Sequence, residues 1–364
     1  IKMSDFSKAP LLSQINGPDD LKKIAPEKFP ELAQEIRYTL IDSLSNTGGH
    51  LGPNLGVVEL TIALHAVFES PTDKFLFDVS HQGYVHKMLT GRATEIDTIR
   101  QYEGLNGFLL RTESEHDCYG AGHAGTALSA ALGMASARDL KDEDTNIVAV
   151  AGDAAFTCGA TLEALNNIAE TTNRCIVILN DNEWSIDKNV GALAKYFNAL
   201  QTHSTFNGIR EKTADFVEKI AGSGVRKLAH KIERNAKNML VPNVLFENFG
   251  MRYFGPIDGH DIPLLIKTLE YLKNQNEPVI LHIITEKGRG YQPALDKPGK
   301  FHGLGPYNIE DGSTATGAPT FSELFGRAVT DFAKEDKTIT SITAGMPGGT
   351  KLETFNAEIT ERYL

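Results

Sequence analysis

The chain has 364 residues, and its 36 Lys and Arg against 47 Asp and Glu make the formal net charge −11. This balance argues against a nucleic-acid-binding protein, whose surface is expected to be basic. It also requires that an anionic ligand be bound at a local positive site or through a metal, because the overall field repels it. Apolar residues make up 41% of the chain, enough to bury a core, and the length predicts about two domains.

The cysteines are few, and they have no metal-ligand spacing. Cys118, Cys158 and Cys175 form an odd, sparse set, which is typical of reduced thiols in a cytosol. No apolar run approaches the ~20 residues that a membrane-spanning helix needs. We therefore expect a cytoplasmic protein that neither binds nucleic acid nor enters a membrane.

The predicted elements alternate between helices and short buried strands. A helical pattern begins at Glu31, and a glycine-rich turn at 48–53 interrupts it. Apolar residues at helical spacing follow at 57–68, then a short buried strand at 74–79. The segment 125–139 is rich in alanine and is typical of a tightly packed helix.

The middle of the chain predicts a parallel sheet. Apolar runs at 147–151 and 175–179 flank a helical stripe that includes Leu162 and Leu165, so strand, helix and strand form a parallel βαβ unit. A further strand at 279–284 follows a helical stretch at 263–273. The predicted fold class is α/β, a parallel sheet flanked by helices.

Composition divides the chain into three predicted parts. Residues 1–292 form the first α/β domain, in which 187–243 is a polar insertion with a basic helix near 225–239. Residues 293–319 are a linker rich in Gly, Pro and Asp. Residues 320–364 begin a second α/β domain with a helix at 321–333 and a strand at 338–343.

Polar residues follow two neighbouring predicted strands. Gly152-Asp153 ends one, and Asn180-Asp181-Asn182 ends the next. Ligands bind beyond the carboxyl ends of strands in such sheets. Asp153, Asn182 and the backbone carbonyl of Trp184 are therefore predicted to bind Mg²⁺ together with phosphate oxygens and water. Each segment alone would be a strand-end turn, but their spacing across one βαβ unit favours a metal site.

Other candidate residues lie in loops at the same edge. Residues 122–126 open a helix, so their backbone N–H groups can face a diphosphate; the alternative is a plain helix start. Residues 287–291 follow the last strand and are either part of the site or a solvated basic turn. His50, His81 and His302 lie in glycine-rich or strand-end loops, and they are better candidates for proton transfer than a lone structural histidine.

The spacing of Gly152-Asp153 and Asn182 resembles the thiamine-diphosphate signature of transketolase-like enzymes. Further ordered segments, between about Leu11 and Leu364, resemble the 1-deoxy-D-xylulose-5-phosphate synthase family within that class. These segments are 48–53 with 59–60, 78–87, 89–92, 122–123, 180–183, 255–260, 287–291 and 301–302. The chain departs from the family pattern at Ala154, where the family has glycine, and at Ala124 and Gly125, where it has serine.

The resemblance implies a thiamine-diphosphate-binding fold and assigns roles to individual residues. The cofactors would be thiamine diphosphate and Mg²⁺. His50, His81 and His302 would surround the reactive thiazolium carbon, whereas His86 and His260 are interpreted as structural. Contacts to the cofactor are expected from His81, Gly122, His123, Ala124, Ala154, Ala155, Asn182 and Tyr291.

The implied reaction joins pyruvate to D-glyceraldehyde 3-phosphate with loss of CO₂, which forms 1-deoxy-D-xylulose 5-phosphate for isoprenoid, thiamine and pyridoxal synthesis. A homodimer is expected by the same resemblance. Two alternatives stay open: another transketolase-like transferase, and a cofactor-binding fragment without activity. The second arises because the family's pyrimidine-binding domain is incomplete here and its catalytic glutamate is expected beyond Leu364. A protein ending at Leu364 is thus expected to bind cofactor weakly and form no product.

Overall fold

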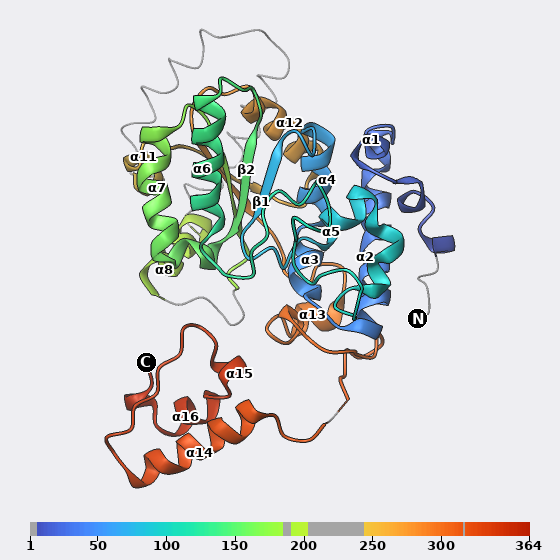
Figure 1. Cartoon of the computed structure of the whole chain (residues 1–364). Helices are drawn as coiled ribbons and strands as arrows, with labels where there is room; N and C mark the ends of the chain where they lie inside the picture. Colours follow the sequence, from blue (N-terminus) through green and yellow to red (C-terminus); the bar gives the residue numbers. More distant parts are fainter. Residues whose placement is uncertain (1–5, 185–190, 203–243, 316) are drawn as a thin grey trace.

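The computed structural model describes residues 6–184, 191–202, 244–315 and 317–364 (Figure 1). The predicted basic helix near 225–239 lies outside the described residues, and so does most of the predicted insertion at 187–243. The described part contains one sheet, helical layers on both of its faces, and a C-terminal group of helices with a core of its own.

Five parallel strands form the sheet in the order β1-β2-β3-β5-β4. The strands are β1 (Lys74–Phe77), β2 (Ile147–Gly152), β3 (Ile176–Asp181), β4 (Arg252–Asp258) and β5 (Val279–Ile284). All but β4 confirm strands that were predicted from apolar runs. Strand β4 was missed because Gly255-Pro256 interrupts its apolar residues, and the register shifts between Phe254 and Ile257. A proline, which lacks an N–H group, is tolerated in β4 because this strand is at the sheet edge.

Four helices cover the sheet: α4 (Val58–Val67), α6 (Ala127–Leu140), α7 (Gly159–Thr171) and α12 (Ile262–Lys273). Each confirms a predicted helical segment. Successive strand residues point to opposite faces. Val148 and Val150 therefore pack with α4 and α12, whereas Ala149 and Ala151 pack with α6 and α7. Figure 1 shows α4 and α6 on opposite sides of β1 and β2.

A further layer packs outside α4. Its main element is α2 (Phe29–Thr47), the helix predicted from Glu31, and its buried residues join those of the N-terminal turns in one cluster. The remaining helices of this part are α1 (Pro18–Leu21), α3 (Leu51–Gly56), α5 (Tyr84–Lys87), α8 (Gly191–Thr202), α11 (Val244–Asn248) and α13 (Gln292–Asp296). Short 3₁₀ or π turns lie at Phe6–Lys8, Leu12–Gln14, Pro26–Lys28, Met88–Arg92, Ala93–Thr98, Asp153–Thr157 and Lys300–His302. No helix among the described residues is both long and apolar enough to cross a bilayer.

The C-terminal helices have their own small core. They are α14 (Phe321–Glu335), α15 (Pro347–Thr350), α16 (Glu353–Glu358) and a 3₁₀ turn at Thr360–Arg362. Thr320 and Glu323 form a capping box that begins α14, and Ala333 packs with Phe355. The predicted strand at 338–343 is wrong: one parallel bridge joins Ser341 to Tyr363, and a single bridge does not make a ladder. The division into two domains and a linker stays a prediction.

Candidate active site

The three histidines predicted for proton transfer lie together, although they come from loops far apart in the sequence. The ring centroids of His50 and His81 are 5.4 Å apart, those of His50 and His302 are 6.0 Å apart, and His81 stacks on His302 at 5.0 Å. His81 follows β1, and His302 lies on the segment that follows β5. We call His50, His81 and His302 the histidine cluster; it lies towards the carboxyl edge of the sheet.

Contacts among these loops explain why the cluster forms. Gly49 donates its N–H to the Leu304 carbonyl at 2.9 Å and accepts one from Leu304 at 3.1 Å, which places the neighbouring histidines side by side. Asn54 is fully buried and donates from its side-chain amide to the carbonyls of His50 (2.7 Å) and His81 (2.8 Å). The cluster is therefore held by backbone contacts, which leave the imidazole rings available for chemistry.

Burial lowers the pKa of two members of the cluster, His50 and His81. Burial, with the nearby charge of Arg100, lowers the pKa of His50 to about 4. Burial, followed by the proximity of His302, His50 and Lys287, lowers the pKa of His81 well below its usual value. Burial also raises the pKa of Tyr84 to about 12, so its hydroxyl stays protonated 3.0 Å from His50 Nδ1. Tyr84 therefore contacts Nδ1 of His50 as donor or as acceptor, according to the tautomer of the ring.

The low pKa of His50 makes the stability of the protein depend on pH. We expect the free energy of unfolding to fall as the pH drops from about 6.5 towards about 4, because the unfolded imidazole takes up a proton near 6.5 while folded His50 resists until about 4. The stabilisation is fully present above the unfolded pKa and is lost in acid. Urea unfolding of His50→Gln should show a shallower decline than the wild type. The exposed His123→Gln is the control, and an unchanged slope in His50→Gln would contradict the assignment.

Two further observations mark the cluster as a binding site. The Nδ1 atom of His81 is buried and has no hydrogen-bond partner among the described residues. Lys287 is 5% exposed, and its Nζ lies 3.1 Å from His302 Nδ1 and 6.0 Å from the Trp184 ring centroid. Unsatisfied buried polar atoms are rare in folded proteins. The contact of His81 with a ligand stays a prediction.

The proposed metal ligands lie at the ends of adjacent strands. Asp153 follows β2 and Asn182 follows β3, and the register pairs Gly152 with Asn180, so the two ends are level. Asp153 is 3% exposed, and Asn182 Oδ1 accepts the Trp184 N–H at 3.1 Å. Among the described residues, no group of three or more His, Cys, Asp and Glu is placed to hold a metal. A single carboxylate with amide and carbonyl oxygens fits Mg²⁺, which takes its other ligands from phosphates and water.

The start of α6 differs from the prediction. The Asp78 carboxylate accepts the N–H groups of Gly125 (2.9 Å), Thr126 (2.9 Å) and Ala127 (3.0 Å). The expectation that 122–126 offers free amides to a diphosphate is therefore wrong for Gly125 and Thr126. Their hydrogen-bonding capacity is used by an aspartate from the end of β1, which the sequence pattern alone did not connect to this helix.

The other predicted cofactor contacts lie in different surroundings. His123 and Ala124 are exposed in the loop before α6, and Gly122 there has a φ of +123°. Ala154 is half-buried, whereas Ala155 packs in the core beside α7, so only its backbone faces outward. The structure does not test whether these residues contact a cofactor.

Tyr291 is also placed more deeply than predicted. It is 7% exposed, packs against Phe301 at 5.6 Å between ring centroids, and donates its hydroxyl to the Ile309 carbonyl at 2.7 Å. These contacts join Tyr291, which precedes α13, to the segment that follows α13. Its predicted contact with the cofactor stays a prediction.

The two histidines that were interpreted as structural have buried protein partners. His260 Nδ1 lies 3.0 Å from Glu59 Oε2, and Arg37 reaches the same carboxylate at 2.6 Å. His86 lies 2.9 Å from His65 and 3.4 Å from Asp117. Both partner sets join elements that are distant in the sequence, which agrees with a structural role.

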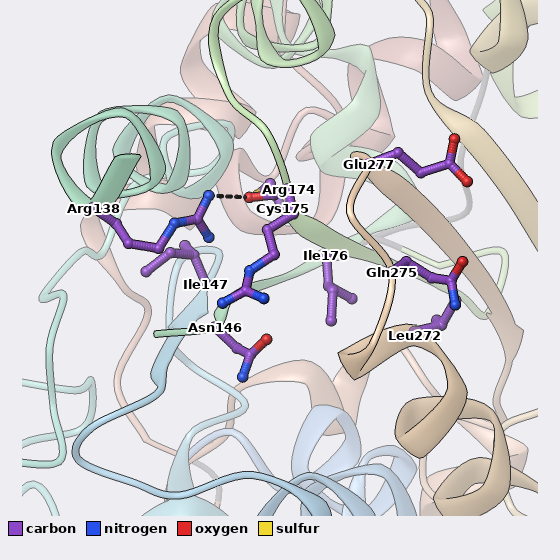
Figure 2. A pocket seen from close by; sticks show the side chains of 9 residues that line it. All are labelled: Arg138, Asn146, Ile147, Arg174, Cys175, Ile176, Leu272, Gln275 and Glu277. Atoms are coloured by element: carbon purple, nitrogen blue, oxygen red, sulfur yellow. Dashed lines mark hydrogen bonds between the residues drawn. The ribbon is translucent and has the colours of Figure 1, made fainter. Parts of the chain in front are cut away.

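A small hollow lies at the opposite, amino-terminal edge of the sheet (Figure 2). Arg138, Arg174 and Glu277 are among its lining residues, and Arg138 donates to the Arg174 carbonyl at 2.7 Å. Its volume of about 10 Å³ has room for one water molecule. An organic ligand does not fit in this hollow.

Three residues of the site were assigned no role from the sequence. Tyr84, Phe108 and Asn54 contact members of the histidine cluster, as does Lys287 of the predicted site segment 287–291. A signal existed for Asn54, which is a lone polar residue within an apolar helical turn. Phe108, whose ring centroid is 5.4 Å from that of His50, offered none, because its loop has no periodic pattern.

The fold and site define a transketolase-like α/β protein. The structure is similar to that of transketolase from Campylobacter jejuni subsp. jejuni NCTC 11168, with a TM-score of 0.55 and 16% identity over 94% of this chain and 61% of that one. A transketolase from Pichia stipitis matches with a TM-score of 0.52 and 16% identity over 73% of this chain and 37% of that one. At such identities the likeness shows the fold alone.

Sequence relatives define the family more closely. The family model described as 1-deoxy-D-xylulose-5-phosphate synthase matches residues 12–285. The curated protein of that name from Methylacidiphilum infernorum (isolate V4) is 56% identical over 354 residues, and that from Acidobacterium capsulatum is 55% identical; both alignments cover 97% of this chain. The chain belongs to the 1-deoxy-D-xylulose-5-phosphate synthase family. It spans 56% of the length of these two relatives.

Proposed function

We propose that this chain forms the diphosphate- and metal-binding part of a 1-deoxy-D-xylulose-5-phosphate synthase. The whole enzyme would join pyruvate to D-glyceraldehyde 3-phosphate with loss of CO₂, supplying isoprenoid, thiamine and pyridoxal synthesis. Family membership supports the reaction. The observation that supports the site is the histidine cluster, which lies at the carboxyl edge of the sheet. The strand ends at that edge carry Asp153 and Asn182. A cytoplasmic homodimer is part of the proposal.

The residues present fit thiamine diphosphate with Mg²⁺. Asp153, Asn182 and the Trp184 carbonyl would hold the metal, which offsets the negative charge of both the diphosphate and the protein. When bound, the cofactor supplies the electron sink that allows pyruvate to lose CO₂ and its remaining carbons to join an aldehyde. The unpartnered Nδ1 of His81 is the atom best placed to receive a polar group of the cofactor.

The histidine cluster would position substrate and move protons. Neutral imidazoles can both donate and accept at physiological pH, and burial keeps His50 and His81 neutral there. Tyr84 contacts Nδ1 of His50, so Nε2 would be the ring nitrogen that reaches a substrate oxygen. Lys287 donates towards His302 Nδ1, which fixes the orientation of that ring.

The test is a calorimetric titration in which thiamine diphosphate is added to the 364-residue protein. The titration is carried out once in the presence of Mg²⁺ and once in the presence of EDTA. We expect binding that depends on Mg²⁺, and weaker binding of thiamine monophosphate, which lacks the second phosphate group. We expect no deoxyxylulose phosphate until the C-terminal portion of the longer relatives is supplied in the same chain or in trans. Pyruvate-dependent CO₂ release in that complete enzyme excludes a transketolase reaction. Equal binding in EDTA would contradict the metal site.

A further inference from the structure

A hydrogen-bonded chain of three polar side chains ends at Asp181, the residue before the proposed metal ligand Asn182. The Tyr253 hydroxyl lies 2.7 Å from His282 Nδ1, and His282 Nε2 lies 3.0 Å from Asp181 Oδ2. His282 and Asp181 are both fully buried. The three residues come from β4, β5 and β3, which are adjacent strands. The proposed chemistry uses none of them, so their cost of burial needs another explanation.

A carboxylate accepts hydrogen bonds, so His282 Nε2 carries a proton and donates to Asp181 Oδ2. Burial raises the pKa of Tyr253 well above its usual value, so its hydroxyl keeps its proton and can donate to His282 Nδ1. Phe246 of α11 stacks on Tyr253 at 5.8 Å between centroids, and Phe197 of α8 lies 6.4 Å from His282. These rings exclude water from the chain.

The carboxylate of Asp181 connects this buried chain to the turn that carries the proposed metal ligands. Its Oδ1 accepts the N–H of Glu183 at 3.3 Å, and Glu183 has a φ of +63°, a conformation that non-glycine residues seldom adopt. The adjacent Asn182 accepts the Trp184 N–H. Thr285 of the β5 end donates to the Asp181 carbonyl at 2.9 Å. The position of the Asn182–Trp184 turn therefore depends on where the Asp181 carboxylate is held.

We propose that His282 is a positioning residue that fixes the Asn182–Trp184 turn through Asp181, and so presets the metal site for the cofactor diphosphate. The inference deepens the proposed function and rests on it for the identity of the ligand. His282 itself touches neither metal nor cofactor. Tyr253 supports it by holding the tautomer in which Nε2 carries the proton, as outer-shell partners of metal ligands commonly do.

The experiment compares two substitutions that differ in one hydrogen bond. His282→Leu removes the donor to Asp181, whereas His282→Gln keeps an N–H donor of similar reach. Thr268→Val on α12 is the control, because it also deletes a buried hydrogen-bonding side chain, but away from the turn. Two quantities are measured: Mg²⁺-dependent affinity for thiamine diphosphate by calorimetry, and amide hydrogen exchange at Glu183 and Trp184 without ligand.

We expect His282→Leu to weaken Mg²⁺-dependent binding about 10- to 100-fold, with faster exchange at Glu183 and Trp184 and with a cooperative thermal transition retained. His282→Gln should recover most of the loss, and Thr268→Val should bind as the wild type does. If His282→Leu had the same affinity and the same exchange rates at Glu183 and Trp184 as the wild type, the inference would be overturned. Failure of His282→Gln to restore either quantity, or uniform acceleration of exchange throughout the protein, would do the same. If the wild type shows no Mg²⁺-dependent binding, the proposed function fails, and exchange at the turn alone decides the inference.

Discussion

Asp153→Asn is expected to abolish Mg²⁺-dependent binding of thiamine diphosphate while leaving the fold intact. Asp153 is the one carboxylate among the proposed ligands, and it is 3% exposed at the end of β2. Asparagine keeps the size and an oxygen that can accept the Ala154 N–H, so local structure should persist. The diphosphate would then approach a protein of formal net charge −11 with its metal bound more weakly. We expect a loss of at least about 100-fold, since outer-shell changes alone cost 10–100-fold.

The measurement is calorimetric titration at fixed Mg²⁺, with unfolding followed in parallel. Asp142→Asn makes the same change of charge at an exposed position in the loop before β2 and should bind as the wild type does. Unchanged affinity in Asp153→Asn would remove Asp153 from the metal site. A parallel loss in both variants would mean that net charge, and not coordination, controls binding.

The sheet was predictable to the extent that its strands are buried on both faces. Such strands appear as continuous apolar runs, so 147–151, 175–179 and 279–284 were found, each within one or two residues of the observed ends. The edge strand β4 lacked that signal because a proline and a glycine interrupt it. The strand expected at 338–343 failed for a different reason: its parallel neighbour begins only at Arg362, and the pairing amounts to one bridge.

The sequence predicted which site residues lie close together when those residues follow the ends of adjacent parallel strands. Asp153 and Asn182 are level because adjacent parallel strands end together, and spacing alone indicated this. Hydrogen bonds between loops gave no such signal. The three amides that Asp78 binds at the start of α6 are about 50 positions away in the sequence, and no period links them. The contacts of Asn54 with His50 and His81 likewise depend on tertiary packing.

Ion pairs between residues distant in the sequence were equally hard to predict. The sequence does not predict that Arg37 and His260 share a partner, because each of them alone suggests a surface side chain. In the structure both reach Glu59. Burial by itself raises the pKa of Glu59, but the hydrogen bond from His260 and the charge of Arg37 hold it below its usual value. Both partners therefore favour the ionised form of this carboxylate inside the protein.

Breaking that network should have the largest effect on stability. In Arg37→Met we expect the free energy of unfolding to fall by about 3–5 kcal/mol, because the buried Glu59 carboxylate loses its main counter-charge. Arg37 also donates to the Leu55 and Arg289 carbonyls, so α3 and the loop after β5 lose anchors as well. Lys287 lies in that loop beside His302, and loosening of the histidine cluster should accompany the loss.

Urea unfolding measures the change, and an exposed pair supplies the comparison. Arg252→Met removes the arginine from an ion pair with Glu277 whose side chains are 38% and 49% exposed, and exposed pairs contribute about 0–1 kcal/mol. A cost for Arg37→Met no larger than that of Arg252→Met would show that water or another cation compensates Glu59. The double variant Arg37→Met/Glu59→Gln should recover part of the lost stability, because the second change removes the buried charge that the first leaves unpaired. No recovery would mean that Arg37 acts through its backbone contacts to α3 and the loop after β5 and not through its charge.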